Sequence, residues 1–354
     1  MPMKQQDIQE FLASGGLPRS EAVQAASAPD LTALKRYQEI KELFLSFVRV
    51  MATAIEERSL YNADHSRRMA NCGERFVDYL NAQAAAQGLP PPFSSAHKRE
   101  LLVSIWLHDV GKITTPLEVM DKAERLSEAQ KAAIHNRLKI IRLQSRLDYL
   151  EGKISAAQRD EVAAQTKQTA TEIDRISKAG FVTDEQLAWL AEVQSRTFTD
   201  EDGQLCSWLE PEEYVMLCIR KGTLSKAERQ VMEHHVEITD KLLAQIKFSA
   251  DYANVRSWAA AHHEFLDGSG YPKHLTAAEI PLEVRIITIL DIFDALIAPD
   301  RPYKLAKPVA EALRILQKMA EEEGKLDVEL VRQFSASHCW EDSGQNATIA
   351  SLIE

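Results

Sequence analysis

Histidines and acids of the kind that bind metal ions stand in a few short motifs of this chain. The motifs are ADHSRRMA, WLHDVGK, MEHHVEIT, HHEFLDGSGYP and ITILDIFDAL. An unpaired carboxylate inside an apolar helix is costly, so the acids in these motifs need a cation. Imidazole and carboxylate ligands without a thiolate suit iron, manganese or zinc. The candidate ligands are His65, His108, Asp109, His235, His262, His263 and Asp291.

The number of candidate ligands indicates more than one metal ion. Seven protein ligands are too many for a single ion, but they suit two ions that share a carboxylate. Asp109 is the natural bridge, because its neighbour His108 can bind one of the two ions. Two ions about 3.5–4 Å apart would hold a phosphate and generate hydroxide between them. The motifs therefore predict a dinuclear centre that hydrolyses a phosphate ester.

Composition restricts the binding partners and the cellular location that we expect for this chain. The chain has 354 residues, of which 45% are hydrophobic, and a net charge of -11. An acidic chain is a poor general ligand for DNA or for an anionic membrane. No apolar run approaches the length of a membrane span, and we expect no signal peptide. The four cysteines form no C-x-x-C pair, which favours a cytoplasmic location over a disulfide framework.

Helical periodicity dominates the segments that must position the candidate ligands. Residues 40–57 place apolar side chains on one face, and KRELLVSIWLHDVGK predicts a second helix that ends at Gly111. PLEVRIITILDIFDALIA predicts a third helix, and no alternating pattern supports a sheet. We therefore predict an all-α fold. Residues 1–39 are interpreted as a leader and linker, and residues 127–178 as one or two long surface helices.

Three of the motifs together resemble a known family. HDVGK at 108–112, HHEFLDGSGYP at 262–272 and DIFDALIAPDRPYK at 291–304 are similar to the HD-GYP subgroup of the HD phosphohydrolases. The resemblance covers roughly 40–117 and 220–335. It implies an HD-type helical bundle over 40–354, interrupted by a long helical insertion at 118–222. It also implies two or three metal ions, usually iron or manganese, and hydrolysis of cyclic dinucleotides, chiefly cyclic di-GMP.

The resemblance assigns a role to each motif residue. Two metal sites would share Asp109, one completed by His65, His108 and Asp291, and the other by His235, His262 and His263. Lys112 would contact the scissile phosphate. The remaining substrate-binding positions would be Gly268, Gly270, Tyr271, Pro272, Arg301 and Lys304. Glycine permits a positive φ and a close backbone approach to a ligand, while Tyr271 would stack, donate a hydrogen bond or pack the loop on the bundle.

Two positions need a decision that the residues alone leave open. Two similar stretches each end in a histidine that could fill one ligand position. LSEAQKAAIH ends at His135, and LSKAERQVMEHH ends at His235. In the family a K-x-G-x-L-T stretch leads to this ligand, and RKGTLSKAERQVMEHH places His235 eleven residues after Leu224. His235 is therefore preferred. Family members with a third metal carry a glutamate where this chain has Tyr61, so we expect two metals.

The implied reaction is hydrolysis of cyclic di-GMP to linear pGpG, with further cleavage to GMP left open. One alternative is the same chemistry on another cyclic dinucleotide, such as 3′3′-cGAMP. Another is a module that senses a dinucleotide or a signalling protein without turnover. The helices at 127–178 are predicted to mediate homodimerisation.

Overall fold

The computed structural model describes residues 28–59, 64–200, 202–298 and 306–341, and most of these residues are helical. They form two compact units, one from residues 28–116, 231–298 and 306–341, the other from 117–230. The predicted all-α fold is confirmed. The named strands of the described ranges are two short segments, β1 (Thr197–Thr199) and β2 (Leu205–Ser207), which pair antiparallel. No described helix combines the length and the apolar composition that crossing a lipid bilayer requires.

The first unit is a helical bundle around α5 (Ser95–Leu107), whose residues 100–107 are all buried. Ser94 begins this helix by accepting a hydrogen bond from the backbone N–H of His97, as an N-cap serine does. The short helices η1 (Val110–Thr114) and η2 (Ala250–Tyr252) belong to the same unit. Its other helices are α3 (Ala28–Glu56), α4 (His65–Ala86), α12 (His235–Leu243), α13 (Val255–Ala259), α14 (Leu282–Ile297), α15 (Val309–Glu321) and α16 (Val328–Ser337).

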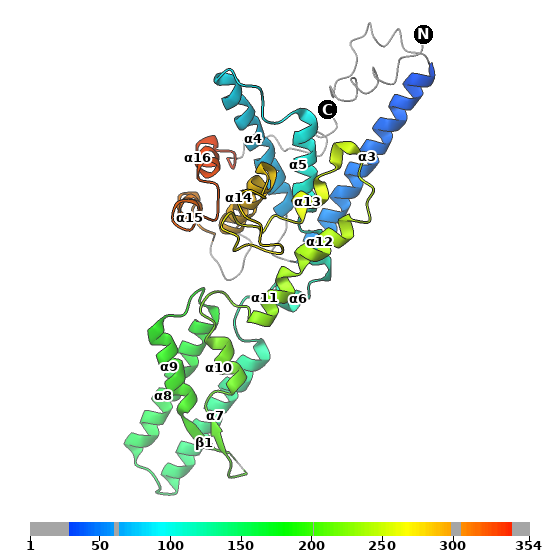
Figure 1. Cartoon of the computed structure of the whole chain (residues 1–354). Helices are drawn as coiled ribbons and strands as arrows, with labels where there is room; N and C mark the ends of the chain where they lie inside the picture. Colours follow the sequence, from blue (N-terminus) through cyan, green and yellow to red (C-terminus); the bar gives the residue numbers. More distant parts are fainter. Residues whose placement is uncertain (1–27, 60–63, 201, 299–305, 342–354) are drawn as a thin grey trace. The chain divides into compact units, whose positions relative to one another are not determined.

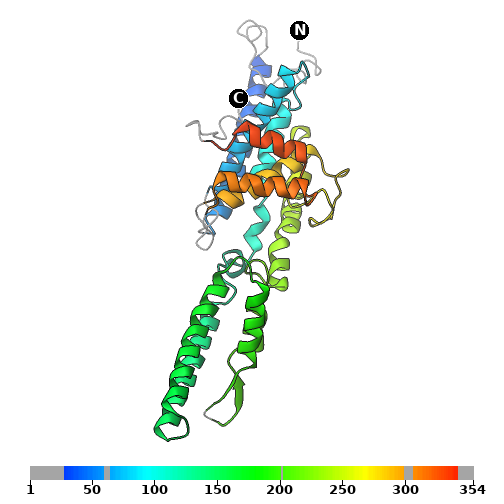
Figure 2. The same ribbon diagram turned by 90° about the vertical axis from the view of Figure 1, so that its left-hand side faces the viewer.

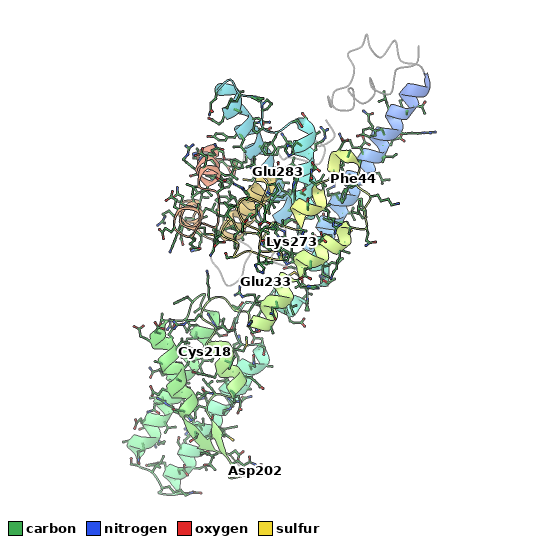
Figure 3. The ribbon with its side chains drawn as sticks, in the orientation of Figure 1. Phe44, Asp202, Cys218, Glu233, Lys273 and Glu283 are labelled. Atoms are coloured by element: carbon green, nitrogen blue, oxygen red, sulfur yellow. The ribbon has the colours of Figure 1, made fainter. Side chains whose placement is uncertain are left out.

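Apolar packing holds the helices of the first unit at fixed positions. Phe76 on α4, Ile105 on α5, Ile287 on α14 and Phe334 on α16 are fully buried in one continuous core. Phe44, labelled in Figure 3, extends this core on α3. Its ring lies against the rings of Phe248 and Tyr252. The helix ends and loops that carry the candidate ligands are therefore attached to a rigid core.

The second unit has a separate apolar core. Its longest helices, α7 (Glu128–Leu150) and α8 (Ala156–Lys178), run side by side as a hairpin (Figures 1 and 2). Each begins at a serine in a capping box, Ser127 or Ser155. The other helices of the unit are α6 (Leu117–Met120), α9 (Asp184–Ser195), α10 (Pro211–Leu217) and most of α11 (Lys226–Glu233).

A buried arginine ties the loops of the second unit together. Arg125 is fully buried and donates hydrogen bonds to the backbone carbonyls of Ile176, Ala179 and Ile219. These carbonyls lie near the ends of α8 and α10, and the carbonyl of Ile176 also accepts from the backbone N–H of Ala179. The guanidinium therefore closes the end of the unit at which the chain enters and leaves.

Candidate metal centre

All seven predicted metal ligands lie in the first unit, on five separate segments. The described structure gathers six of them into two clusters in which the candidate ligand atoms all lie within 4.8 Å of one another. The first cluster consists of His65, His108 and Asp109, and the second cluster of His235, His262 and His263. Asp291, on α14, lies against both clusters, with Oδ1 3.4 Å from His65 Nε2 and Oδ2 3.6 Å from His263 Nδ1.

Helix ends orient three of the imidazoles in the same way. The Nδ1 atoms of His108, His235 and His262 each lie 2.6–2.7 Å from the backbone carbonyl three residues earlier. These carbonyls belong to the last turns of α5, α11 and α13, where a helix lacks N–H partners. A carbonyl can only accept, so Nδ1 carries the proton in each ring and Nε2 is left with a free lone pair.

The carboxylate of Asp109 lies between the two clusters. Its Oδ2 is 3.4 Å from His108 Nε2 and 3.9 Å from His65 Nε2. Its Oδ1 is 3.3 Å from His235 Nε2 and 3.8 Å from His262 Nε2. Each oxygen thus faces the imidazoles of a different cluster, which is the arrangement that a bridging carboxylate requires.

The candidate ligand atoms of the centre face one another without a hydrogen between them, which suits metal ions. His235 Nε2 and His262 Nε2 are 3.4 Å apart, although both rings carry their proton on Nδ1, so two lone pairs face each other. Burial, together with the neighbouring imidazoles, lowers the pKa of His262 well below its usual value, so a proton on the His262 ring does not relieve this contact. Among the described residues, His108 Nε2 and Asp109 Oδ1 are buried without a hydrogen-bond partner. Cations placed between these atoms would satisfy all of them.

Asp294, one helical turn after Asp291, orients the remaining imidazole of the first cluster. Its Oδ2 accepts a hydrogen bond of 2.7 Å from His65 Nδ1, and its carboxylate also accepts two bonds from the Arg68 guanidinium. Burial opposes protonation of His65, but the hydrogen bonds to Asp291 and Asp294 outweigh it and raise the pKa of His65 to about 9. The site therefore favours positive charge at this imidazole, whether a proton or a metal ion supplies it.

We expect Asp294→Asn to weaken metal binding at the first cluster by about 10- to 100-fold, as loss of a carboxylate behind a ligating histidine does. The asparagine keeps the shape of the side chain but removes the charge that polarises His65. Titration of the metal-free protein with Mn²⁺ measures the effect directly. Asp240→Asn, which removes a partly exposed carboxylate paired with Arg256, is the matched control. Equal Mn²⁺ affinity in the two variants would contradict the role of Asp294.

The backbone of the HDVGK motif, residues 108–112, packs tightly against α12. The hydroxyl of Thr239 donates to the carbonyl of His108 at 3.1 Å and accepts from the N–H of Gly111 at 2.9 Å. A Cβ atom at Gly111 would lie 1.9 Å from the carbonyl oxygen of His235. The contact between η1 and α12 that joins the two clusters therefore requires glycine at this position.

The loop HHEFLDGSGYP folds back on its own first residues. A Cβ atom at Gly270 would lie 2.3 Å from the backbone nitrogen of Phe265, so this glycine permits close packing within the loop. The Tyr271 ring lies against the His263 ring, with centroids 4.8 Å apart. Gly268 has a φ of 77°, and the Tyr271–Pro272 peptide bond is cis. In this arrangement Tyr271 packs on a candidate metal ligand.

A buried acid that the sequence analysis missed fixes the end of this loop. Glu264 is 2% exposed, and its carboxylate accepts hydrogen bonds from the backbone N–H groups of Lys273 and Leu275 at 2.7 and 2.9 Å (Lys273 is labelled in Figure 3). The only signal in the sequence is its position directly after the two histidines. Asp294 had a clearer signal, since it follows Asp291 by three residues on a helix and so shares its face.

The other residues considered in the sequence analysis lie beside the first cluster, lie apart from both clusters, or fall outside the described residues. Lys112 Nζ is 2.5 Å from Asp109 Oδ2, at the edge of the first cluster. His234, the neighbour of His235, is half exposed and faces Glu237, and His135 faces Asp174 in the second unit. Arg301, Lys304 and Tyr61 lie outside the described residues, so their predicted roles stay predictions.

Comparisons with known proteins indicate which proteins the chain is similar to. Residues 206–330 match the family described as HD domain. The chain is 32% identical over 166 residues to 3′3′-cGAMP-specific phosphodiesterase 3 of Vibrio cholerae, an alignment that covers 47% of this chain and 33% of that protein. It is 34% identical over 124 residues to a cyclic di-GMP phosphodiesterase of Thermotoga maritima, covering 33% of this chain and 31% of that protein.

A third relative is the cyclic di-GMP phosphodiesterase response regulator RpfG of Xanthomonas campestris. The chain is 42% identical to it over 100 residues, an alignment that covers 28% of this chain and 25% of that protein. The chain thus spans a third or less of the length of these three curated relatives.

Proposed function

Because the chain carries an HD domain of the HD-GYP type, we propose that it is a metal-dependent phosphodiesterase that hydrolyses a cyclic dinucleotide. The observation that carries the proposal is the pair of His/Asp clusters joined by the two oxygens of Asp109. Imidazole and carboxylate donors suit Fe²⁺ or Mn²⁺, and we propose two such ions per chain. When bound, the ions would activate water and neutralise charge on the phosphate.

The protein's own residues would hold this centre and orient the substrate. The backbone carbonyls behind His108, His235 and His262 keep each Nε2 atom aimed at Asp109, so little reorganisation is needed when a phosphate enters. Lys112, whose ammonium group lies 2.5 Å from Asp109 Oδ2, is proposed to contact a phosphate oxygen of the substrate. Arg301 and Lys304 are proposed to bind the flanking phosphate. These cations explain how an acidic chain would accept a dianion.

We propose cyclic di-GMP as the substrate, with pGpG as product and GMP as a possible product of further hydrolysis. The relatives favour a second candidate equally, because the alignment that covers 47% of this chain is to a 3′3′-cGAMP-specific phosphodiesterase. A module that binds dinucleotide without turnover is less consistent with a complete set of candidate ligands. We also propose that the second unit is an insertion within the catalytic domain.

Turnover of a panel of cyclic dinucleotides tests the proposal. Protein purified without oxygen and loaded with Mn²⁺ or Fe²⁺ would be incubated with cyclic di-GMP, 3′3′-cGAMP and cyclic di-AMP, and the products separated by chromatography. We expect a linear dinucleotide from cyclic di-GMP. If only 3′3′-cGAMP is cleaved, the proposed substrate is wrong but the proposed type of reaction stands. Binding of any of the three without product would overturn the enzymatic assignment.

A further inference from the structure

Helix α7 of the second unit has a second apolar face that its own unit leaves exposed. The face consists of Ile140, Leu143, Leu147 and Leu150, which we call the α7 seam. The exposed fractions of these residues are 49%, 48%, 57% and 78%. Single exposed apolar side chains are ordinary on a protein surface, but a continuous row of four large ones marks an interaction site.

The α7 seam is separate from the face that packs inside the unit. Ile134, Leu138 and Ile141 are buried in the core of the second unit. At 3.6 residues per turn the seam lies about half a turn around the helix from these residues. A helix that is apolar on two opposite faces needs a partner for each. The core of the second unit supplies one partner, so the seam needs another.

The spacing of the seam identifies the kind of partner. Its four residues recur at intervals of three, four and three, which are the a and d positions of two heptads. Such a row packs best against a helix with the same spacing, and a second copy of this chain offers one. Pairing of two identical seams about a twofold axis also gives a closed dimer.

The charges beside the seam favour a parallel pair. With Ile140 and Leu147 at the a positions, Arg146 is at g and Glu151 at e, and parallel helices bring g and the following e together. Arg146 would then face Glu151 of the second copy on both sides of the dimer; Glu151 is the C-cap residue of α7, and within one chain it pairs with the exposed Lys153. Within the described residues Arg146 has no ion pair of its own, whereas an antiparallel pair would bring it near the ammonium group of Lys139.

We propose that this chain forms a homodimer in which α7 pairs in parallel with α7 of a second copy through Ile140, Leu143, Leu147 and Leu150. The proposal makes specific the general expectation that residues 127–178 mediate self-association. It does not depend on the proposed enzymatic function, because its test measures mass and not turnover.

Sedimentation equilibrium of the full chain over a wide concentration range provides the test. We expect the wild type to approach twice the mass of one chain. The double variant Leu143→Glu/Leu147→Glu should raise the dissociation constant about a hundredfold or more, because four buried leucines are lost per dimer. Val215→Glu, on α10 of the same unit and 62% exposed, is the matched control and should leave the dimer intact. Glutamate is a good helix former, so circular dichroism should show unchanged helix content.

A charge exchange tests the identity and direction of the partner. Arg146→Glu and Glu151→Arg should each weaken the dimer several-fold, and the double variant should restore it. A monomeric wild type, or a dimer unaffected by the Leu143→Glu/Leu147→Glu change, would overturn the proposal. Failure of the charge exchange to restore association would rule out the parallel pair.

Discussion

Replacement of Asp109 by asparagine is expected to reduce turnover of the cyclic dinucleotide by about a thousandfold or more. Each carboxylate oxygen of Asp109 faces the imidazoles of one cluster, at 3.3–3.9 Å. Asparagine keeps the size of the side chain, but its NH₂ group cannot act as a ligand and would point a donor at one of the two clusters. We would measure the initial rate of product formation with saturating Mn²⁺.

Asp78→Asn is the control for this change, because Asp78 lies in the same unit but is 58% exposed and paired with Lys98. It should leave the rate unaltered. Circular dichroism should show that Asp109→Asn keeps its helices, since the aspartate belongs to the centre and not to the apolar core. An Asp109→Asn rate within tenfold of the wild-type rate would show that the carboxylate does not join two metal sites.

Substitution of Gly111 by alanine is expected to have the largest effect on stability. The new Cβ atom would lie 1.9 Å from the carbonyl oxygen of His235 and 2.6 Å from the backbone nitrogen of Thr239, so backbone has to move. Overpacking of this kind costs about 3 kcal/mol. Separation of η1 from α12 would also weaken the hydrogen bond from Gly111 to Thr239 and move His235 away from Asp109.

Thermal unfolding followed by circular dichroism measures this cost. We expect the midpoint of the first unit to fall by about 10 °C in Gly111→Ala. Gly180→Ala is the control, because no described atom lies within 4 Å of the place its Cβ atom would take and no positive φ is required there. If both variants unfold at the same temperature as the wild type, the contact between residues 108–112 and α12 is looser than these distances indicate.

Ligand types and motif order could be predicted from the sequence, because they depend on local chemistry. His108 next to Asp109, the His262–His263 pair and Asp291 in an apolar helix each indicate a metal ligand without knowledge of the fold. The helical fold followed from apolar periodicity. The paired strands β1 and β2 were missed because each has only three residues, too few to show an alternating pattern.

The supporting contacts could not be predicted, because they join segments that are far apart in the chain. Thr239 contacts Gly111 across 128 positions, and Asp294 contacts His65 across 229. The close approach at Gly270 was expected to serve a ligand, whereas the described backbone neighbour is Phe265 of the same loop. The capping of helix carbonyls by Nδ1 depends on where α5, α11 and α13 end, which periodicity locates only to within a few residues.

Metal content per chain tests the central claim most directly. Wild-type protein, purified without oxygen, saturated with Mn²⁺ and freed of loosely bound ions, would be analysed by mass spectrometry of its metals. The two clusters joined by Asp109 predict two tightly bound ions per chain. One ion or none in folded protein would contradict the dinuclear centre on which the proposed reaction depends.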